Sequence, residues 1–203
     1  MCLILTVNKR AMKKIKFIII SILTLVIFQN CSDNDNDSSN NTCNLLYVFD
    51  ATIGLFTQAN GYSLQTIDNK LHQIEVKPSI GGTICGISYQ NAPNYSGTYQ
   101  FSIYVDNHLK YQGDLSFTQN SYEIKSIPNF QFNANQTIKV VRICNSSNPS
   151  DWIGEVYRKL DFSNINFPLT HGNIEYLNGI SHDNDGGPIN SVVPALLLTF
   201  KAN

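Results

Sequence analysis

Residues 99–117 read YQFSIYVDNHLKYQGDLSF, and this stretch decides the expected fold. Aromatic and β-branched residues alternate with polar ones on both sides of Asp106 and Asn107, as in two half-buried strands joined by a tight turn. The pattern predicts an antiparallel hairpin, and Gly113 marks a bulge or bend in the returning strand. The side chains expected on one face of that strand are those of Leu109, Tyr111, Leu115 and Phe117.

Short runs of the same kind flank the hairpin, and they are bounded by Gly, Asn, Pro and Asp. About ten strands at this spacing predict an all-β fold, an antiparallel β-sandwich of jelly-roll kind. A single helical turn near Trp152 is the one exception that the pattern allows. The further expected strands are Leu45–Phe49, Leu71–Val76, Thr83–Tyr89, Tyr122–Ile127, Thr137–Ile143, Trp152–Tyr157, Asn173–Leu177 and Ala195–Phe200.

The charge balance excludes one class of partner. The 203 residues include 14 Lys and Arg and 15 Asp and Glu, which leaves a net charge of −1. A nucleic-acid partner needs several basic side chains arrayed against phosphates, so we expect no nucleic-acid binding.

The N-terminal region has the features of a secretion signal. Three lysines follow Met12, and an apolar run extends over residues 17–28. This run is shorter than the roughly 20 residues of a spanning helix, but it fits the apolar region of a signal peptide. We therefore expect residues 1–30 to be a cleaved signal peptide whose true start is Met12.

Cys31 follows the apolar run directly and resembles the lipid-bearing cysteine of bacterial lipoproteins. The family pattern has Leu three residues before the cysteine and a small residue just before it, whereas this chain has Phe28 and Asn30. The resemblance implies that Cys31 becomes lipidated and anchors the chain to a membrane. Residues 31–42 are rich in Ser, Asp and Asn, and we expect a disordered tether there.

A Ser- and Asp-rich segment after the anchoring cysteine also resembles the surface-export signal of Bacteroidota lipoproteins. That resemblance implies an outer-membrane lipoprotein whose domain, residues 43–203, faces the medium. The alternative is a plain spacer that leaves the domain facing the periplasm.

Three segments of the domain resemble jelly-roll modules of unknown function that occur in secreted and surface proteins. They are Cys85–Tyr89, Tyr99–Ile103 and Phe167–Gly172. The resemblance implies a sandwich with a ligand-facing sheet, and it transfers no site residues.

Three cysteines remain in the expected mature domain: Cys43, Cys85 and Cys144. In an oxidising compartment, Cys85 and Cys144 could bridge two core strands and leave Cys43 free or paired between molecules. Alternatively, Cys85 and Cys144 are small buried apolar residues, which is the interpretation we favour because their spacing fits no metal or redox motif.

Two polar loops with aromatic residues are the strongest candidates for ligand contact, namely residues 90–95 and 145–152. Sugars are bound by aromatic faces together with amides and acids that pair with hydroxyls. The candidate ligand-binding residues are Trp152, Tyr95, Asn94 and Asp151, although a tyrosine or a single tryptophan in a sandwich often packs in the core.

Residues 182–187 read HDNDGG and resemble the start of a calcium loop, which makes Asp183 and Asp185 candidate metal ligands. No carboxylate follows where such a loop would end, so an ordinary turn explains the same residues. No other cofactor is expected. No catalytic motif was recognised in the sequence, so no residue is predicted to be catalytic.

These features favour a non-catalytic, surface-displayed lipoprotein module that binds an extracellular glycan or an envelope component. A structural or protein-interaction lipoprotein without a small-molecule site is the main alternative. A hydrolase acting on polysaccharide is a third, since catalytic carboxylates in a sandwich can lie far apart in sequence.

Overall fold

The computed structural model describes residues 54–93, 95–118, 121–182 and 191–202. The chain divides into two units, Met1–Asn40 and Asn41–Asn203, and all the described residues belong to the second. No helix among them is long and apolar enough to cross a membrane.

The described residues form twelve strands and two single turns of 3₁₀ helix, η1 (Gln58–Asn60) and η2 (Pro149–Asp151). The strands are β1 (Tyr62–Asp68), β2 (Leu71–Pro78), β3 (Gly82–Gln90), β4 (Tyr99–Val105), β5 (His108–Leu115), β6 (Tyr122–Phe132), β7 (Ile138–Cys144), β8 (Ile153–Lys159), β9 (Leu169–His171), β10 (Ile174–His182), β11 (Val192–Pro194) and β12 (Leu197–Ala202).

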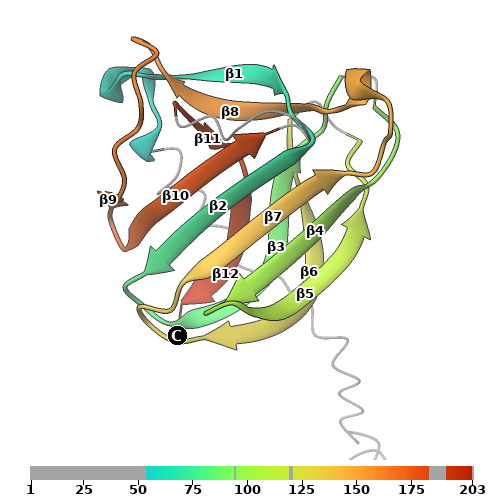
Figure 1. Ribbon diagram of the computed structural model, residues 1–203. Helices are drawn as coiled ribbons and strands as arrows, with labels where there is room; N and C mark the ends of the chain where they lie inside the picture. The colour runs from blue at the N-terminus through green and yellow to red at the C-terminus, as the bar shows by residue number, and fades with distance from the viewer. Residues whose placement is uncertain (1–53, 94, 119–120, 183–190, 203) are drawn as a thin grey trace, which may run out of the picture. The chain divides into compact units, whose positions relative to one another are not determined.

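The strands form three antiparallel sheets, with orders β5-β4-β7-β2-β10-β9, β12-β3-β6 and β1-β8-β11. The six-stranded sheet lies in front of β3, β6 and β12 in Figure 1, so the fold is a sandwich. Strands β11 and β12 are separated by Ala195 and Leu196 alone, and the chain passes from one sheet to another there. The predicted all-β, antiparallel sandwich is confirmed.

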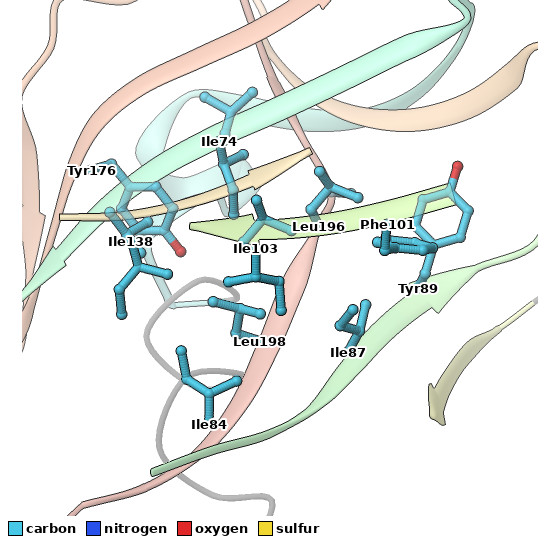
Figure 2. Packing of buried hydrophobic residues seen from close by; sticks show 14 of the residues in the cluster. Ile74, Ile84, Ile87, Tyr89, Phe101, Ile103, Ile138, Tyr176, Leu196 and Leu198 are labelled. Carbon is cyan, nitrogen blue, oxygen red and sulfur yellow. The ribbon is translucent and has the colours of Figure 1, made fainter. Parts of the chain in front are cut away.

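The core fills the space between these layers. Figure 2 shows Ile74, Ile103 and Ile138 of the six-stranded sheet facing Ile84 and Leu198 of the opposite sheet. Strands β2 and β7 bury every second residue, as a strand with one core-facing side must. The two-residue hydrophobic period therefore determines which face of the sheet packs.

The β4–β5 hairpin confirms the turn prediction. Asp106 and Asn107 have φ angles of 48° and 65°, the left-handed pair that a two-residue hairpin turn requires. The Asp106 carboxylate accepts hydrogen bonds from the Thr137 backbone N–H at 2.9 Å and the Gln136 amide at 2.7 Å. These bonds, the Thr137 one above all, lower the pKa of Asp106.

One detail of the hairpin prediction is wrong. The register shifts where Ile103 pairs with Tyr111 and Tyr104 pairs with Leu109, whereas Gly113 pairs regularly with Phe101. The irregularity therefore lies near Lys110 rather than at Gly113. Because of this irregularity, the side chain of Leu109 does not lie on the same face of β5 as that of Tyr111. The Leu109 side chain is 50% exposed.

Most of the other predicted strands are present, some of them longer than expected. The helical turn expected near Trp152 is η2, which ends at Asp151. Leu45–Phe49 lies outside the described residues. Strands β1, β9 and β11 were not predicted, because β9 and β11 have three residues each and β1 (YSLQTID) is mostly polar.

Of the two interpretations of Cys85 and Cys144, the bridge between them is wrong. The favoured interpretation, two buried residues without a bridge, is right for Cys144, which is a free and fully buried thiol, and wrong for Cys85. Cys85 is disulfide-bonded, so its partner is a cysteine other than Cys144.

Candidate functional site

Two neighbouring rows of side chains cross the inner face of the six-stranded sheet. In the row that we call the apolar row, each of the four central strands β4, β7, β2 and β10 contributes an apolar residue or a glycine: Ile103, Val140, Ile74 and Gly179. In the next row, which we call the polar row, three of the four residues are polar: Phe101, Arg142, His72 and Ser181. Every member of the polar row is fully buried.

Arg142 connects the polar row to the surrounding loops. Its Nη1 donates to the Asn69 carbonyl at 3.1 Å, and its Nη2 donates to the Ile153 carbonyl at 2.9 Å and the Tyr89 hydroxyl at 2.6 Å. The guanidinium also lies 5.1 Å from the ring centre of Tyr89 and 4.7 Å from that of Tyr99. A buried cation needs such partners. These contacts fix Arg142 relative to the turn between β1 and β2, which contains Asn69, and to the start of β8, where Ile153 lies.

His72 lies beside Arg142 and is fully buried. Within the described residues, neither imidazole nitrogen has a partner. Burial, and next the neighbouring Arg142 charge, hold the pKa of His72 well below its ordinary value. The ring is therefore neutral, and it packs beneath Gly154, where an added methyl group would collide with His72, Arg142 and Tyr89.

The loop between β3 and β4 is held by Tyr99, which stacks on Arg142. The Tyr99 hydroxyl donates to the Asn91 amide oxygen at 3.0 Å, and it accepts from the Ala92 backbone N–H. The Asn91 amide then donates to the Tyr95 carbonyl at 2.7 Å. Finally, the Tyr95 hydroxyl donates to the Thr98 carbonyl at 2.8 Å. A continuous series of contacts therefore runs from Arg142 to Thr98.

The loop between β7 and β8 closes on itself through side chains. The Ser146 hydroxyl donates to the Asp151 carboxylate at 2.6 Å, and the Trp152 indole N–H donates to the Ser146 carbonyl at 2.9 Å. The Asn145 amide reaches Thr98 Oγ1 at 2.8 Å and Asp114 Oδ1 at 3.1 Å. The Asn145 bond joins this loop to the β3–β4 loop.

The two loops line an open, shallow hollow of about 450 Å³. Hydroxyl, amide and carboxylate groups dominate its wall, and Tyr95 provides an aromatic ring. The buried Cys144 thiol lies close by, where it donates to the Asp151 carbonyl at 3.4 Å. Burial above all, and then the neighbouring Cys144 and Asp151, raise the pKa of Tyr95, so its hydroxyl remains protonated. The lining residues are Tyr95, Ser96, Gly97, Thr98, Asn145, Ser146 and Asp151.

The structure brings together part of the predicted ligand-binding set. Tyr95 and Asp151 line the same hollow although 55 residues separate them in sequence. Trp152 is outside the lining: it packs on the core, holds Ser146, and has the Lys70 ammonium 5.2 Å above its ring. Trp152 therefore supports the loop instead of offering an open stacking face.

Several predicted site residues lie outside the described residues, and their roles stay predictions. They include the lipidation site Cys31 and the ligand-binding candidate Asn94. Among the described residues, no group of three or more His, Cys, Asp and Glu side chains could hold a metal ion. The calcium candidates Asp183 and Asp185 also belong to the undescribed part of the chain.

Sequence reasoning missed Arg142 and His72. Both lie on strands that were predicted, and both fall on the core-facing side of the alternation, Arg142 after Ile138 and Val140 and His72 before Ile74. A charged residue in phase with buried neighbours was the available signal. It was overlooked because charged residues in strands usually face solvent.

A carboxylate with a raised pKa lies away from the hollow. Glu155 on β8 has one buried carboxylate oxygen without a hydrogen-bond partner in the described part of the chain, and burial raises its pKa. A smaller hollow of about 320 Å³ lies at the start of β1, where it is lined by Asn60, Gly61, Lys159, Leu160 and Asp161. Glu155 lines neither hollow.

The resemblance to jelly-roll modules remains a prediction, since β-strand order alone does not assign a family. No family model, no curated protein and no solved structure matches this chain.

Proposed function

We propose that the described domain is a non-catalytic module that binds a glycan in the hollow between the β3–β4 and β7–β8 loops. The observation that carries the proposal is the wall chemistry. Two serines, a threonine, an amide, a carboxylate and a tyrosine converge there from two loops that the core holds in place. Sugar hydroxyls need such mixed donors and acceptors, and a hollow of this size accepts one or two sugar rings.

The charge of the wall favours neutral sugars. Asp151 is the single carboxylate among the described lining residues, and these include no Lys or Arg. A uronic or sulfated sugar would bring its negative charge against this carboxylate. We therefore expect neutral polysaccharides to bind better than acidic ones.

The wall also supports binding in preference to hydrolysis. Glycoside hydrolysis generally uses two carboxylates on opposite sides of the scissile bond. In the described lining, Asp151 has no second carboxylate facing it. If the anchor predicted at Cys31 is formed, a tethered domain of this kind would capture glycan at a membrane surface.

Native electrophoresis of the full chain tests this proposal, in gels cast with neutral or acidic polysaccharides, with and without calcium. We expect retardation by a neutral polysaccharide. Asp151→Asn should weaken it about tenfold, because one charge-assisted hydrogen bond is lost.

Asp161→Asn is the matched control, since Asp161 also accepts a hydrogen bond from a nearby serine, Ser163, but lies outside this hollow. Retardation that Asp151→Asn and Asp161→Asn change equally would contradict the site. No retardation in any gel would favour an envelope-protein partner, and retardation that requires calcium would direct attention to Asp183 and Asp185.

A further inference from the structure

The β12-β3-β6 sheet is buried on the face that points away from the core, which we call the far face. Ile87 of β3 pairs with Leu198 of β12, and both belong to the core. Their chain neighbours Ser88 and Leu197 also pair, and they point to the far face because side chains alternate along a strand. Ser88 is 0% exposed and Leu197 is 1% exposed. An antiparallel sheet with one face in the core usually leaves the other face in water, so these two side chains lie under a cover.

The buried part of the far face lies over β3 and β12 and ends at β6. Thr199 shares the far face with Leu197, two residues away, and is 2% exposed. A methyl group added at Gly86, which pairs with Thr199, would meet Thr199 Oγ1 and the Ile124 side chain. On β6, Ile124 and Ser126 occupy the same face and are exposed. The cover therefore spans two of the three strands.

The described elements do not account for this cover. The six-stranded sheet packs on the core side (Figure 1), and the β1-β8-β11 sheet packs chiefly on β2 and β10. Cys85 and Leu197 are buried, yet neither belongs to the core cluster of the described residues. The hydroxyls of Ser88 and Thr199 have no hydrogen-bond partner in the described part of the chain. An apolar cover gives this result, because it excludes water and offers no donor or acceptor.

The disulfide at Cys85 indicates which part of the chain lies nearby. Cys85 is disulfide-bonded and Cys144 is a free thiol. The sequence has five cysteines, so the partner of Cys85 is Cys2, Cys31 or Cys43. Cys43 belongs to the same compact unit as Cys85, whereas the other two belong to the unit Met1–Asn40. A disulfide needs Cα atoms about 4.4–6.8 Å apart, which favours two cysteines of one compact unit.

The residues that follow Cys43 have the composition of an apolar cover. Residues 44–53 read NLLYVFDATI and begin with the apolar run LLYVF at residues 45–49. Burying such a run against a sheet removes its apolar surface from water. The chain from residue 43 to residue 54, where the described part begins, spans up to about 36 Å when extended. Strand β3 is about 30 Å long, so this segment is long enough to follow it.

We propose that Cys43 forms the disulfide with Cys85 and that residues 44–53 pack on the far face over β3 and β12. The S–S bond forms as the two thiols give up two protons and two electrons. A dithiol–disulfide oxidoreductase of an oxidising compartment accepts them, and its own disulfide is reduced to two thiols. The bridge joins the start of the domain covalently to the middle strand of this sheet. If Cys31 is lipidated, residues 32–42 are left as the tether. The proposal does not depend on the proposed glycan function.

Peptide mapping of the unreduced full chain tests the bridge. Cleavage before aspartates places Cys43 in residues 37–49, Cys85 in residues 68–105 and Cys144 in residues 114–150, and it ends the Cys31 peptide at residue 32. We expect mass spectrometry to find the 37–49 and 68–105 peptides joined. A Cys31–Cys85 or Cys2–Cys85 peptide would overturn the proposal, and the former would also exclude lipidation of the Cys31 thiol.

Thermal unfolding with and without a reductant tests the same bridge through stability. Reduction should lower the Tm of wild-type protein by about 5–15 °C, because it releases a closed loop of the unfolded chain. Cys31→Ser is the matched control and should respond like wild-type protein, whereas Cys43→Ser should not respond. Equal responses of the two variants would contradict the pairing.

Hydrogen exchange of the wild-type full chain tests the cover. We expect backbone amides of residues 44–53 to exchange at least about tenfold more slowly than those of the expected tether, residues 32–42. Cys43→Ser should reduce this protection and Cys31→Ser should leave it unchanged. Exchange of residues 44–53 as fast as that of residues 32–42 would overturn the proposal, and residues 183–190 would then be the segment to test as the cover.

Discussion

The apolar row and the polar row are adjacent on the same four strands and are both buried, yet they differ in the chemistry of the side chains that they bury. The apolar row fills its space with hydrocarbon and connects sheet to sheet. The polar row buries a cation and an imidazole, which is costly, and directs hydrogen bonds from Arg142 to the carbonyls of Asn69 and Ile153 outside the sheet. The difference indicates that the apolar row maintains the sandwich, whereas the polar row also shapes the loops around the hollow.

Removing the cation should have the largest effect. Arg142→Leu leaves two buried carbonyls and the Tyr89 hydroxyl without their donor, and we expect the free energy of unfolding to fall by about 3–5 kcal/mol. Urea unfolding of the full chain measures this loss. Glycan retardation should also be lost, because the loops are no longer held.

Val140→Ala, one row away, is the comparison for that variant. It should cost about 2 kcal/mol through a cavity and leave retardation unchanged. If Arg142→Leu weakened stability no more than Val140→Ala and kept full retardation, the distinction between the rows would fail.

Crowding the polar row should have the next largest effect. A methyl group at Gly154 meets His72, Arg142 and Tyr89, so Gly154→Ala should cost about 2–3 kcal/mol in thermal or urea unfolding. The control is Gly172→Ala, where nothing lies within 4 Å and only the φ of 56° opposes the change. That control should cost about 1 kcal/mol, and equal losses at the two glycines would contradict tight packing at Gly154.

Acid should weaken the polar row specifically. The pKa of His72 is lowered by folding, so below pH 6.5 the unfolded chain takes up a proton that the native chain does not. Stability should therefore fall by up to about 1.4 kcal/mol per pH unit, from pH 6.5 down to the native pKa of His72. Urea unfolding at a series of pH values measures this slope. His72→Leu should remove its share of the slope, and an unchanged slope would show that another group is responsible.

The hairpin at the far end of the sheet should give the smallest effect. Asn107 has a φ of 65°, which asparagine tolerates better than alanine, so Asn107→Ala should cost about 1 kcal/mol in urea unfolding. Glycan retardation should be unaffected, because the turn lies beyond the apolar row. Loss of retardation in a folded Asn107→Ala protein would mean that the hollow is not the binding site.

The sequence predicted those parts of the molecule that follow local rules. Two-residue alternation identified β2, β4 and β7, and the Asp106-Asn107 pair identified the turn. Polar, aromatic-bearing loops pointed to Tyr95 and Asp151, which the structure places in the lining of one hollow. Strand β1 was missed because most of its residues are polar, and the bulge was misplaced because pairing, not glycine content, determines register.

The burial of the polar row could not be predicted from local sequence patterns, for a different reason. Whether Arg142 faces solvent or core depends on which side of β7 the rest of the fold covers. Its partners lie on β3, β4, the start of β8 and the turn between β1 and β2, and those contacts exist only after the sandwich has formed. Trp152 was assigned to a ligand face for the same reason, since its contact with Ser146 is made within a folded loop.

Hydrogen exchange of the full chain tests the central claim most directly, which is that Arg142 holds the loops around the hollow. Backbone amides of residues 91–98 and 145–152 are compared in wild-type protein, Arg142→Leu and Val140→Ala, under conditions where all three are folded. We predict faster exchange of both loops in Arg142→Leu and unchanged loop exchange in Val140→Ala. Equal loop exchange in wild-type protein and Arg142→Leu would contradict the claim, because the hollow would then keep its shape without the buried cation.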